Sequence, residues 1–377
     1  MQEAGLYIHI PFCDHKCIYC DFYSITNTAK TEEYIDALVR EIQYYSPLYK
    51  DSHNFTSLFF GGGTPSFIAP ELIQKIIFAL RHDYTVSPDA EITIETNPGT
   101  VDEHKLRSYL SMGVNRISIG IQSFDDDDLR FLTRIHNAEL AKSTVQLAKQ
   151  VGFNNINVDL IFNLPGQTSA KWESNLAQAL ALPIQHISAY SLILEEGTPL
   201  FGMVEKGKVR LQGDDDDAEL YADTIDTLIK KGFKQYEVSN FCKPEFECVH
   251  NNHYWLYDDY LSFGTSSHSF VNGKRWNNFR ALPEYLKAVN EKGNAVESEE
   301  TPNARQVFDE YVMLALRSKG IDKKDFQSRF SDSWLREKSG VLQKLMQSGY
   351  LVDQGACIKC TPEGYAVADN IIGQLLA

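Results

Sequence analysis

Three cysteines stand close together near the start of the chain, in the sequence Cys13-Asp-His-Lys-Cys17-Ile-Tyr-Cys20. Iron–sulfur clusters are held by thiolates, and three ligands to a four-iron cluster leave one iron open to another molecule. The alternative is zinc, but structural zinc prefers four protein ligands in paired spacings, and His15 lies inside the loop. The spacing therefore favours an iron–sulfur cluster over zinc.

A triple glycine, Gly61-Gly62-Gly63, runs into Thr64 and Pro65 directly after a run of β-forming residues. Glycine has no Cβ, so a ligand can approach the backbone closely at such a place. A triple glycine alone is more often a turn. Its position after a strand and before Thr-Pro favours a binding loop instead.

Six short β-rich runs alternate with amphipathic helical patterns through the first half of the chain. The runs are Leu6–Ile10, Ser57–Phe60, Glu91–Glu95, Arg116–Ile121, Asn157–Phe162 and His186–Leu192, and the helical patterns are Glu32–Tyr45, Pro70–Arg81, Asp102–Met112, Leu129–Val151 and Ala170–Leu180. This alternation predicts a parallel sheet, because each parallel pairing needs a crossover. Polar and glycine-rich segments follow the strands, where α/β folds assemble their sites. We expect an α/β fold, a partial (βα)6 barrel of the TIM type.

The rest of the chain changes character twice. Residues 201–300 are of mixed pattern and rich in aromatic residues and asparagine, which we interpret as an extension of a barrel at residues 1–200. Residues 301–377 turn helical, with patterns at Ala304–Ser318 and Trp334–Ser348 before a hairpin-like YLVDQGACIKCT. We expect this third domain to be winged-helix-like and to serve a structural or docking role.

Charge and hydropathy narrow the class of protein. The chain has 377 residues, with 36 Lys+Arg against 51 Asp+Glu and a formal net charge of -15. Surfaces that bind phosphate backbones carry a basic excess, so nucleic acid is disfavoured as a partner, and with it a transcription regulator. No secretory signal opens the chain and no window reaches about 18 apolar residues. We therefore expect a cytoplasmic protein with reduced thiols.

The cysteine motif after a first strand, with Tyr19 before its last cysteine and GGGTP after the second strand, resembles the radical S-adenosylmethionine (SAM) superfamily. The resemblance implies that Cys13, Cys17 and Cys20 hold a [4Fe–4S] cluster whose fourth iron binds SAM. It also implies an electron donor for that cluster. The protein's part is then to hold, orient and shield the cofactor.

A narrower resemblance covers most of the chain and is to the anaerobic coproporphyrinogen III oxidase family. The motifs LYIHIPFC, YCDF, FGGGTPS, NRISIGIQSF, RIHN, NVDLIFNLPGQT and AYSL occur in that order. The family's SAM contacts then fall on Tyr7, Tyr19, Gly62, Gly63, Thr64, Glu95, Gln122, Arg134 and Asp159, the last three in a deeper cleft where the oxidase holds a second SAM. The ordinary alternative for Glu95 and Asp159 is a helix cap, or a buried ion pair with Arg134 or Arg116.

Two subgroups of that family differ in the residue two after the third cysteine. The oxidase subgroup has the pattern C-x3-C-x2-C-x-C and a leader before the cluster strand. This chain has Phe22 in place of the fourth cysteine of that pattern, and its Cys13 lies near the start. The HemW heme-chaperone subgroup has the pattern C-x3-C-x2-C-x-F, which this chain resembles, and carries an H-N-x-x-Y-W motif. This chain matches that motif with His250, Asn251, Tyr254 and Trp255. Histidine is a common heme-iron ligand and aromatic faces pack on macrocycles, so the complete motif favours a heme site over an ordinary histidine.

The resemblance as a whole implies a heme chaperone that carries a [4Fe–4S] cluster and SAM. Such a protein passes heme to acceptor proteins, which we expect to include respiratory, membrane-bound enzymes reached by transient membrane contact. The departures from the oxidase pattern count against coproporphyrinogen dehydrogenase activity. The rival hypothesis is the oxidase itself, which decarboxylates coproporphyrinogen III to protoporphyrinogen IX by radical SAM chemistry.

The remaining four cysteines receive ordinary interpretations. Cys242 and Cys248 flank the approach to His250 and could add a metal ligand, but we expect reduced thiols. Cys357 and Cys360 form a single C-x2-C pair, which lacks two of the ligands that zinc needs.

Two acidic runs and one further histidine have residue types that could bind a metal ion or a cofactor. Asp125–Asp128 and Asp214–Asp217 each precede a helical pattern, so we expect solvated helix starts and not Mg²⁺ sites. His268 lies in GTSSHSF, a loop that the family places near the cofactor. Ser266 and Ser267 stand there where the subgroup usually has more glycine.

Overall fold

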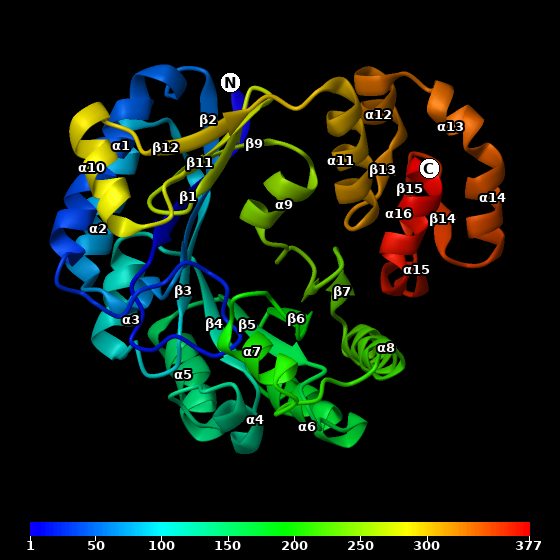
Figure 1. Ribbon diagram of the computed structural model, residues 1–377, viewed down its shortest axis with the longest axis horizontal. Coiled ribbons are helices and arrows are strands. Elements are labelled where there is room, and N and C mark those ends of the chain that lie inside the picture. Colours follow the sequence, from blue (N-terminus) through cyan, green and yellow to red (C-terminus); the bar gives the residue numbers. More distant parts are fainter.

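Six parallel strands, paired in sequence order, form the centre of the computed structural model, which describes residues 1–377. They are β1 (Gln2–Ile10), β2 (His53–Gly62), β3 (Val86–Thr96), β4 (Arg116–Gln122), β5 (Asn155–Phe162) and β6 (His186–Ser191). The sheet curves, and its crossover helices cover the outer face (Figure 1). The predicted α/β partial barrel is confirmed.

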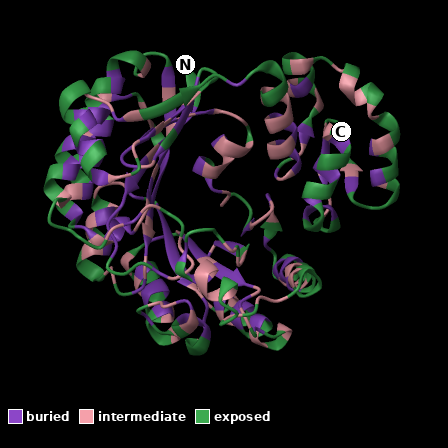
Figure 2. Ribbon diagram, viewed as in Figure 1, coloured by how far each residue is buried: buried purple, intermediate pink, exposed green.

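The crossover helices bury one apolar stripe each against the sheet. They are α1 (Thr31–Tyr49), α2 (Pro70–Asp83), α3 (Glu103–Ser111), α5 (Ala138–Val151) and α6 (Ser169–Leu180). In α5, for example, Ala141, Val145 and Ala148 are buried, at the spacing of one helical face. The buried residues in Figure 2 follow this contact between strands and helices.

The helix predicted over Leu129–Val151 was wrong, because the chain breaks there into two. A short helix, α4 (Asp126–Phe131), ends before a connection in which Thr133 has a positive φ of 58°. The Asn137 side chain then accepts a hydrogen bond from the backbone N–H of Leu140 and begins α5. The break gives residues 132–137 a loop conformation beside the barrel rim.

Residues 201–300 add strands to both edges of the central sheet. Beyond β1 lies β9 (Asp259–Phe263), parallel to it, followed by β10 (His268–Val271), β11 (Lys274–Asn278) and β12 (Val296–Glu300). Beyond β6 lie β8 (Asn240–Cys242) and β7 (Lys234–Gln235). The remaining helices of this region are α7 (Pro199–Glu205), α8 (Asp214–Lys230), α9 (Val249–Trp255) and α10 (Leu282–Lys292). Helix α9 lies inside the curve of the sheet, against β1, β2 and β9 (Figure 1).

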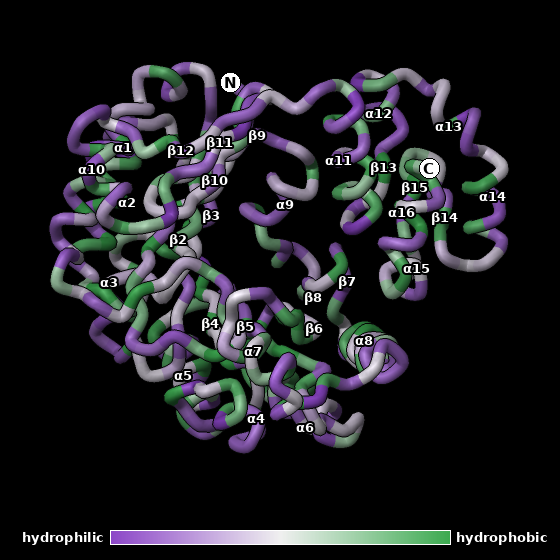
Figure 3. The backbone as a smooth tube through the Cα atoms, viewed as in Figure 1, coloured by the Kyte–Doolittle hydropathy of each residue, from purple (hydrophilic) through white to green (hydrophobic).

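The C-terminal region has its own hydrophobic core. Its elements are α11 (Ala304–Leu316), β13 (Ile321–Asp322), α12 (Lys323–Phe330), α13 (Ser333–Glu337), α14 (Ser339–Gln347), β14 (Leu351–Asp353), β15 (Cys357–Cys360), α15 (Pro362–Ala366) and α16 (Ala368–Leu376). The predicted hairpin is β14–β15, and the helix predicted over Trp334–Ser348 is divided in two at Lys338. No helix of the chain is both long and apolar enough to cross a membrane, and hydrophilic residues interrupt the hydrophobic ones throughout Figure 3.

Candidate functional site

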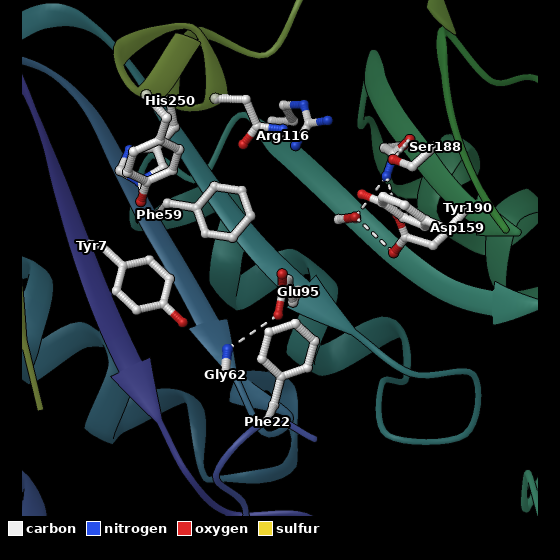
Figure 4. A pocket seen from close by; sticks show the side chains of 14 residues that line it. Tyr7, Phe22, Phe59, Gly62, Glu95, Arg116, Asp159, Ser188, Tyr190 and His250 are labelled. Atoms are coloured by element: carbon white, nitrogen blue, oxygen red, sulfur yellow. Dashed lines mark hydrogen bonds between the residues drawn. The ribbon is translucent and has the colours of Figure 1, made fainter. Parts of the chain in front are cut away.

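A cavity with two lobes lies on the inner face of the sheet, beneath α9. The inner lobe has a volume of about 210 Å³ and the outer lobe about 440 Å³. Tyr7, Phe22 and Tyr254 line both lobes and so mark the boundary between them. The inner lobe, drawn in Figure 4, is otherwise lined by Phe59, Gly62, Glu95, Arg116, Ser118, Asn157, Asp159, Ser188, Tyr190, His250 and Asn251.

The polar lining of the inner lobe comes from alternate positions of neighbouring strands. Arg116 and Ser118 share one face of β4, and Asn157 and Asp159 share one face of β5. Residues at i and i+2 of a strand point to the same side. The intervening residues of β4, such as Ile117, are buried in the core. Arg116, Ser118 and Asn157 were not predicted as site residues. The alternation of polar and apolar residues along β4 and β5 is the sequence signal that could have indicated them.

The cluster loop, residues 13–20, follows β1 at the rim of the barrel. All three of its cysteines are free thiols, with Cys13 and Cys17 buried and Cys20 partly exposed. Burial raises the pKa of the Cys13 and Cys20 thiols. No three His, Cys, Asp or Glu side chains converge as the ligands of a single metal ion would. A four-iron cluster makes no such demand, because each thiolate binds a different iron.

The glycine-rich loop after β2 lies directly against the cluster loop. The Cys13 thiol is 3.3 Å from the Thr64 hydroxyl, and the backbone N–H of Thr64 donates to the carbonyl of Phe12. A Cβ on Gly63 would lie 2.7 Å from the carbonyl carbon of Pro11. Gly62 has a φ of +110°, and a Cβ there would lie 2.6 Å from the His9 ring. These glycines are therefore required for the two loops to pack together, which brings the predicted residues of both motifs to one place.

Arg134 lies against the cluster loop and lines neither lobe. Its guanidinium donates to the Cys17 sulfur at 3.6 Å and to the carbonyl of Gly120 at 2.5 Å. Tyr19 is beside it, and burial raises the pKa of that phenol. Gln122, predicted for the deeper cleft, lines neither lobe and ends β4 with a φ of 74°.

Two carboxyl groups face the inner lobe. Glu95 accepts a hydrogen bond from the backbone N–H of Gly62 at 3.2 Å (Figure 4). Burial, together with the neighbouring Asp159, raises the pKa of Glu95 to about 8. Burial also raises the pKa of Asp159, which accepts hydrogen bonds from Asn157 and Ser118. Neither carboxyl forms an ion pair with Arg134 or Arg116, so both stay available to a ligand, with Glu95 largely protonated at neutral pH.

His250 projects from α9 into the inner lobe beside two aromatic rings, which also contact each other. Its ring centroid lies 5.1 Å from that of Phe59 and 6.2 Å from that of Tyr7. Nδ1 lies 2.8 Å from the Ser57 hydroxyl, and Nε2 lies 2.7 Å from the Tyr254 hydroxyl. Burial lowers the pKa of His250 well below its usual value, so the ring is neutral. With Nδ1 donating to Ser57, Nε2 carries the lone pair that a metal ion could take.

Glu91 on β3 fixes the start of α9, and the sequence analysis missed it. Its carboxylate accepts hydrogen bonds from the backbone N–H groups of Val249 and His250, both at 3.2 Å, and from the Cys248 thiol at 3.4 Å. Arg116 lies 3.9 Å from the same carboxylate. Glu91 is more than 150 residues from α9 along the chain, so no local pattern could have indicated this contact.

The other residues of the H-N-x-x-Y-W motif occupy different surroundings. Asn251 and Tyr254 line the inner lobe together with His250, whereas Trp255 ends α9 and lines neither lobe. His253, one turn further along α9, lies 2.9 Å from the Thr56 hydroxyl and lines neither lobe. The motif therefore contributes three side chains to the cavity.

The acidic runs do start helices, as predicted, but one of their members is not solvated. Asp125 accepts hydrogen bonds from the first turn of α4, and Asp214–Asp217 form the first turn of α8. Asp128, in contrast, is buried and accepts from Ser123 and Lys171, so the prediction of a solvated run was wrong there.

His268 lines the outer lobe, in the loop that the sequence analysis noted. Ser266 also lines this lobe and has a φ of +57°, a conformation that glycine adopts more readily. The geometry therefore accounts for a preference for glycine at this position.

Comparisons with known proteins relate the whole chain to one group. Residues 7–178 match the model of the Radical SAM superfamily, and residues 304–367 match that of the HemN C-terminal domain. The "Heme chaperone HemW" of Bacillus subtilis is 32% identical over 98% of this chain and 98% of its own, and that of Haemophilus influenzae is 34% identical over 99% and 97%. The solved coproporphyrinogen III oxidase HemN of Escherichia coli, 24% identical, covers 99% of this chain and 90% of its own with a TM-score of 0.85, which shows a shared fold.

Proposed function

Because the chain belongs to the HemW family of the radical SAM superfamily, we propose that it is a heme chaperone that binds heme at His250 and transfers it to acceptor proteins. The observation that carries the proposal is the state of His250. Its ring is neutral and lies beside aromatic side chains in a cavity, and Nε2 contacts the Tyr254 hydroxyl at 2.7 Å. In the tautomer in which Nδ1 donates to Ser57, Nε2 carries the lone pair that a metal ion takes. Neutral imidazole is a common ligand of heme iron.

Membership of the superfamily implies a [4Fe–4S] cluster and SAM. In this proposal Cys13, Cys17 and Cys20 hold the cluster, and SAM binds the iron that has no cysteine. When bound, such a cluster supplies the electron for reductive cleavage of SAM. Three free thiols on one loop, with Arg134 donating to the Cys17 sulfur, support the assignment.

The glycine-rich loop and the inner lobe provide groups for the rest of SAM. Thr64, Gly62 and Gly63 stand at its methionine end, Tyr7 and Tyr19 lie beside the cluster, and Glu95 takes the ribose. A protonated Glu95 can both donate to and accept from ribose hydroxyls, and burial raises its pKa to about 8. Gln122, Arg134 and Asp159 complete the set predicted from the sequence, although only Asp159 lines the lobe.

The cellular setting belongs to the same proposal. We place the protein in the cytoplasm, with an electron donor for the cluster and with respiratory heme proteins, some of them membrane-bound, as acceptors. We include no nucleic acid among its partners, because the net charge is -15. Phe22 lines both lobes and stands where the oxidase pattern has a fourth cysteine, a departure that counts against coproporphyrinogen conversion.

Heme titration tests the proposal. The full chain is reconstituted anaerobically with iron and sulfide and titrated with hemin, followed by absorbance, as the native sequence and as His250→Ala and His253→Ala. We expect His250→Ala to lose the bound-heme spectrum. His253→Ala is the matched control, because His253 is buried on the same helix but lines neither lobe.

Two results would contradict the proposal. One is unchanged hemin binding in His250→Ala, or no binding by the native chain. The other is conversion of coproporphyrinogen III to protoporphyrinogen IX by the reconstituted protein with SAM and a reductant, which would establish the rival oxidase activity.

A further inference from the structure

The outer lobe has the lining of a site for a flat, largely apolar ring. Its five aromatic side chains, drawn from separate segments of the chain, are Tyr7, Phe22, Tyr23, Tyr254 and Tyr260. At about 440 Å³ it falls within the usual range of small-molecule sites, roughly 300–1,000 Å³. It meets the inner lobe at Tyr7 and Tyr254, and Tyr254 contacts His250 directly. A ring whose metal is bound by His250 would therefore extend across this boundary.

One cation stands at the rim of the outer lobe with most of its hydrogen-bonding capacity unused. Arg280 lies in the connection between β11 and α10, and its side chain is 59% exposed. It donates to the backbone carbonyl of Asp21 at 3.2 Å and lies 3.7 Å from the Asp21 carboxylate. A guanidinium has five N–H donors in a fork that fits a carboxylate, so several remain for a ligand. His268 adds a ring nitrogen to the same lobe.

The two lobes differ in how they would receive a carboxylate. The inner lobe already contains two carboxyl groups, Glu95 and Asp159, and its guanidinium, Arg116, lies 3.9 Å from the Glu91 carboxylate. A ligand carboxylate there would be desolvated beside these two carboxyl groups, and the guanidinium that could compensate its charge is already paired with Glu91. The outer lobe has one carboxylate, Asp21, and that group is exposed at the rim, where solvent screens it. Charge complementarity therefore favours the outer lobe.

We propose that the outer lobe holds the acidic edge of the heme and that Arg280 binds its propionate carboxylates. This inference rests on the proposed function, because it concerns the cargo held at His250. Tyr7, Phe22 and Tyr254 then contact the apolar ring, while the charged edge lies at the rim. Asp21 must yield its contact with Arg280 to the ligand, so loading exchanges one ion pair for another.

The test compares hemin with hemin dimethyl ester, in which both carboxylates are blocked. Both ligands are titrated into the reconstituted full chain as the native sequence, Arg280→Ala, Arg280→Lys and Arg107→Ala. We expect Arg280→Ala to weaken hemin about tenfold, as loss of a charge-assisted hydrogen bond does, and to leave the ester unchanged. Arg280→Lys should fall between. Arg107, equally exposed at 61% on α3, is the control and should match the native chain.

The outcomes separate this inference from the function on which it rests. If His250→Ala abolishes hemin binding but Arg280→Ala weakens neither ligand, or weakens both equally, the propionate assignment is overturned and the heme chaperone stands. The assignment is also overturned if Arg116→Gln weakens the binding of hemin but not of the ester, while Arg280→Ala binds hemin as the native chain does. The propionates would then lie in the inner lobe. If the native chain binds neither ligand, both proposals fail.

Discussion

The cluster loop and helix α9 present ligands to neighbouring parts of the same cavity, but their ligands are held in opposite ways. The cluster loop follows the barrel rim, and its Asp14, His15 and Lys16 are exposed. The Cys13 sulfur lies 3.3 Å from the Thr64 hydroxyl and the Cys17 sulfur accepts from Arg134, contacts that a sulfur bound to iron can keep. On α9, both ring nitrogens of His250 are hydrogen-bonded. The cysteines are thus ready to bind iron, whereas the histidine must first be uncovered.

This difference has a consequence for loading. Each buried hydrogen bond between neutral groups contributes about 1 kcal/mol net. Freeing Nε2 of His250 breaks its bond to the Tyr254 hydroxyl and leaves the bond to Ser57, which holds the ring in place. Heme binding must offset the loss of one such bond. Cluster assembly has no comparable requirement, so the two cofactor regions should respond differently to substitution.

The largest expected effect is the loss of the iron–sulfur cluster when the cysteines of the cluster loop are replaced. Replacing Cys13, Cys17 and Cys20 together with alanine should abolish iron and sulfide incorporation, because no other thiols of the chain lie on that loop. Iron analysis after anaerobic reconstitution measures this, and far-ultraviolet circular dichroism checks the fold. Cys357→Ala, in the C-terminal region, is the control and should retain full iron content. If the triple variant incorporated as much iron as the native chain, the cluster would have to bind elsewhere than this loop.

The second effect falls on α9 and should spare the cluster. Glu91→Ala leaves Arg116 buried without its 3.9 Å partner and frees the N–H groups of Val249 and His250. Breaking a buried ion pair costs about 3–5 kcal/mol, so the free energy of unfolding should fall by about that amount and hemin affinity should fall with it. Urea unfolding and hemin titration measure the two.

A matched substitution controls for the loss of a carboxylate. Glu103→Ala removes a glutamate that is paired with Arg107 on the exposed face of α3, so unfolding should change by less than about 1 kcal/mol. Iron content should equal that of the native chain in both variants. An unaltered unfolding free energy in Glu91→Ala would show that α9 is positioned without this residue.

How far the sequence could predict these regions depends on the distance between the residues involved. The cluster loop and the order of the strands follow from local patterns, so they were predictable. The alternation of Arg116 and Ser118 with core residues is also a local pattern, and it places both side chains on one face of β4. The anchoring of α9 joins Glu91 and Ser57 to residues far along the chain, and only the folded sheet brings them together. Domain limits at residues 200 and 300 stay a prediction.

The smallest effect tests whether the Tyr254 hydroxyl restrains heme binding. Tyr254→Phe removes the group 2.7 Å from Nε2 of His250 and keeps the ring that lines both lobes. Since one hydrogen bond of about 1 kcal/mol no longer has to be broken, hemin affinity should rise about fivefold. Tyr260→Phe is the matched control, because its ring lines the outer lobe and its hydroxyl makes no contact with His250.

The direction of the change in Tyr254→Phe decides between two roles for that hydroxyl. If it only occupies Nε2 until heme arrives, affinity rises. The contrast between thiols that keep their contacts and a heme ligand that must lose one is then sharpened. If the hydroxyl instead contacts the bound heme, affinity falls, because the complex loses a bond that the free protein can replace with water. A fall in Tyr254→Phe but not in Tyr260→Phe would therefore break the comparison, since Nε2 would then be no more restrained than the cysteine thiols.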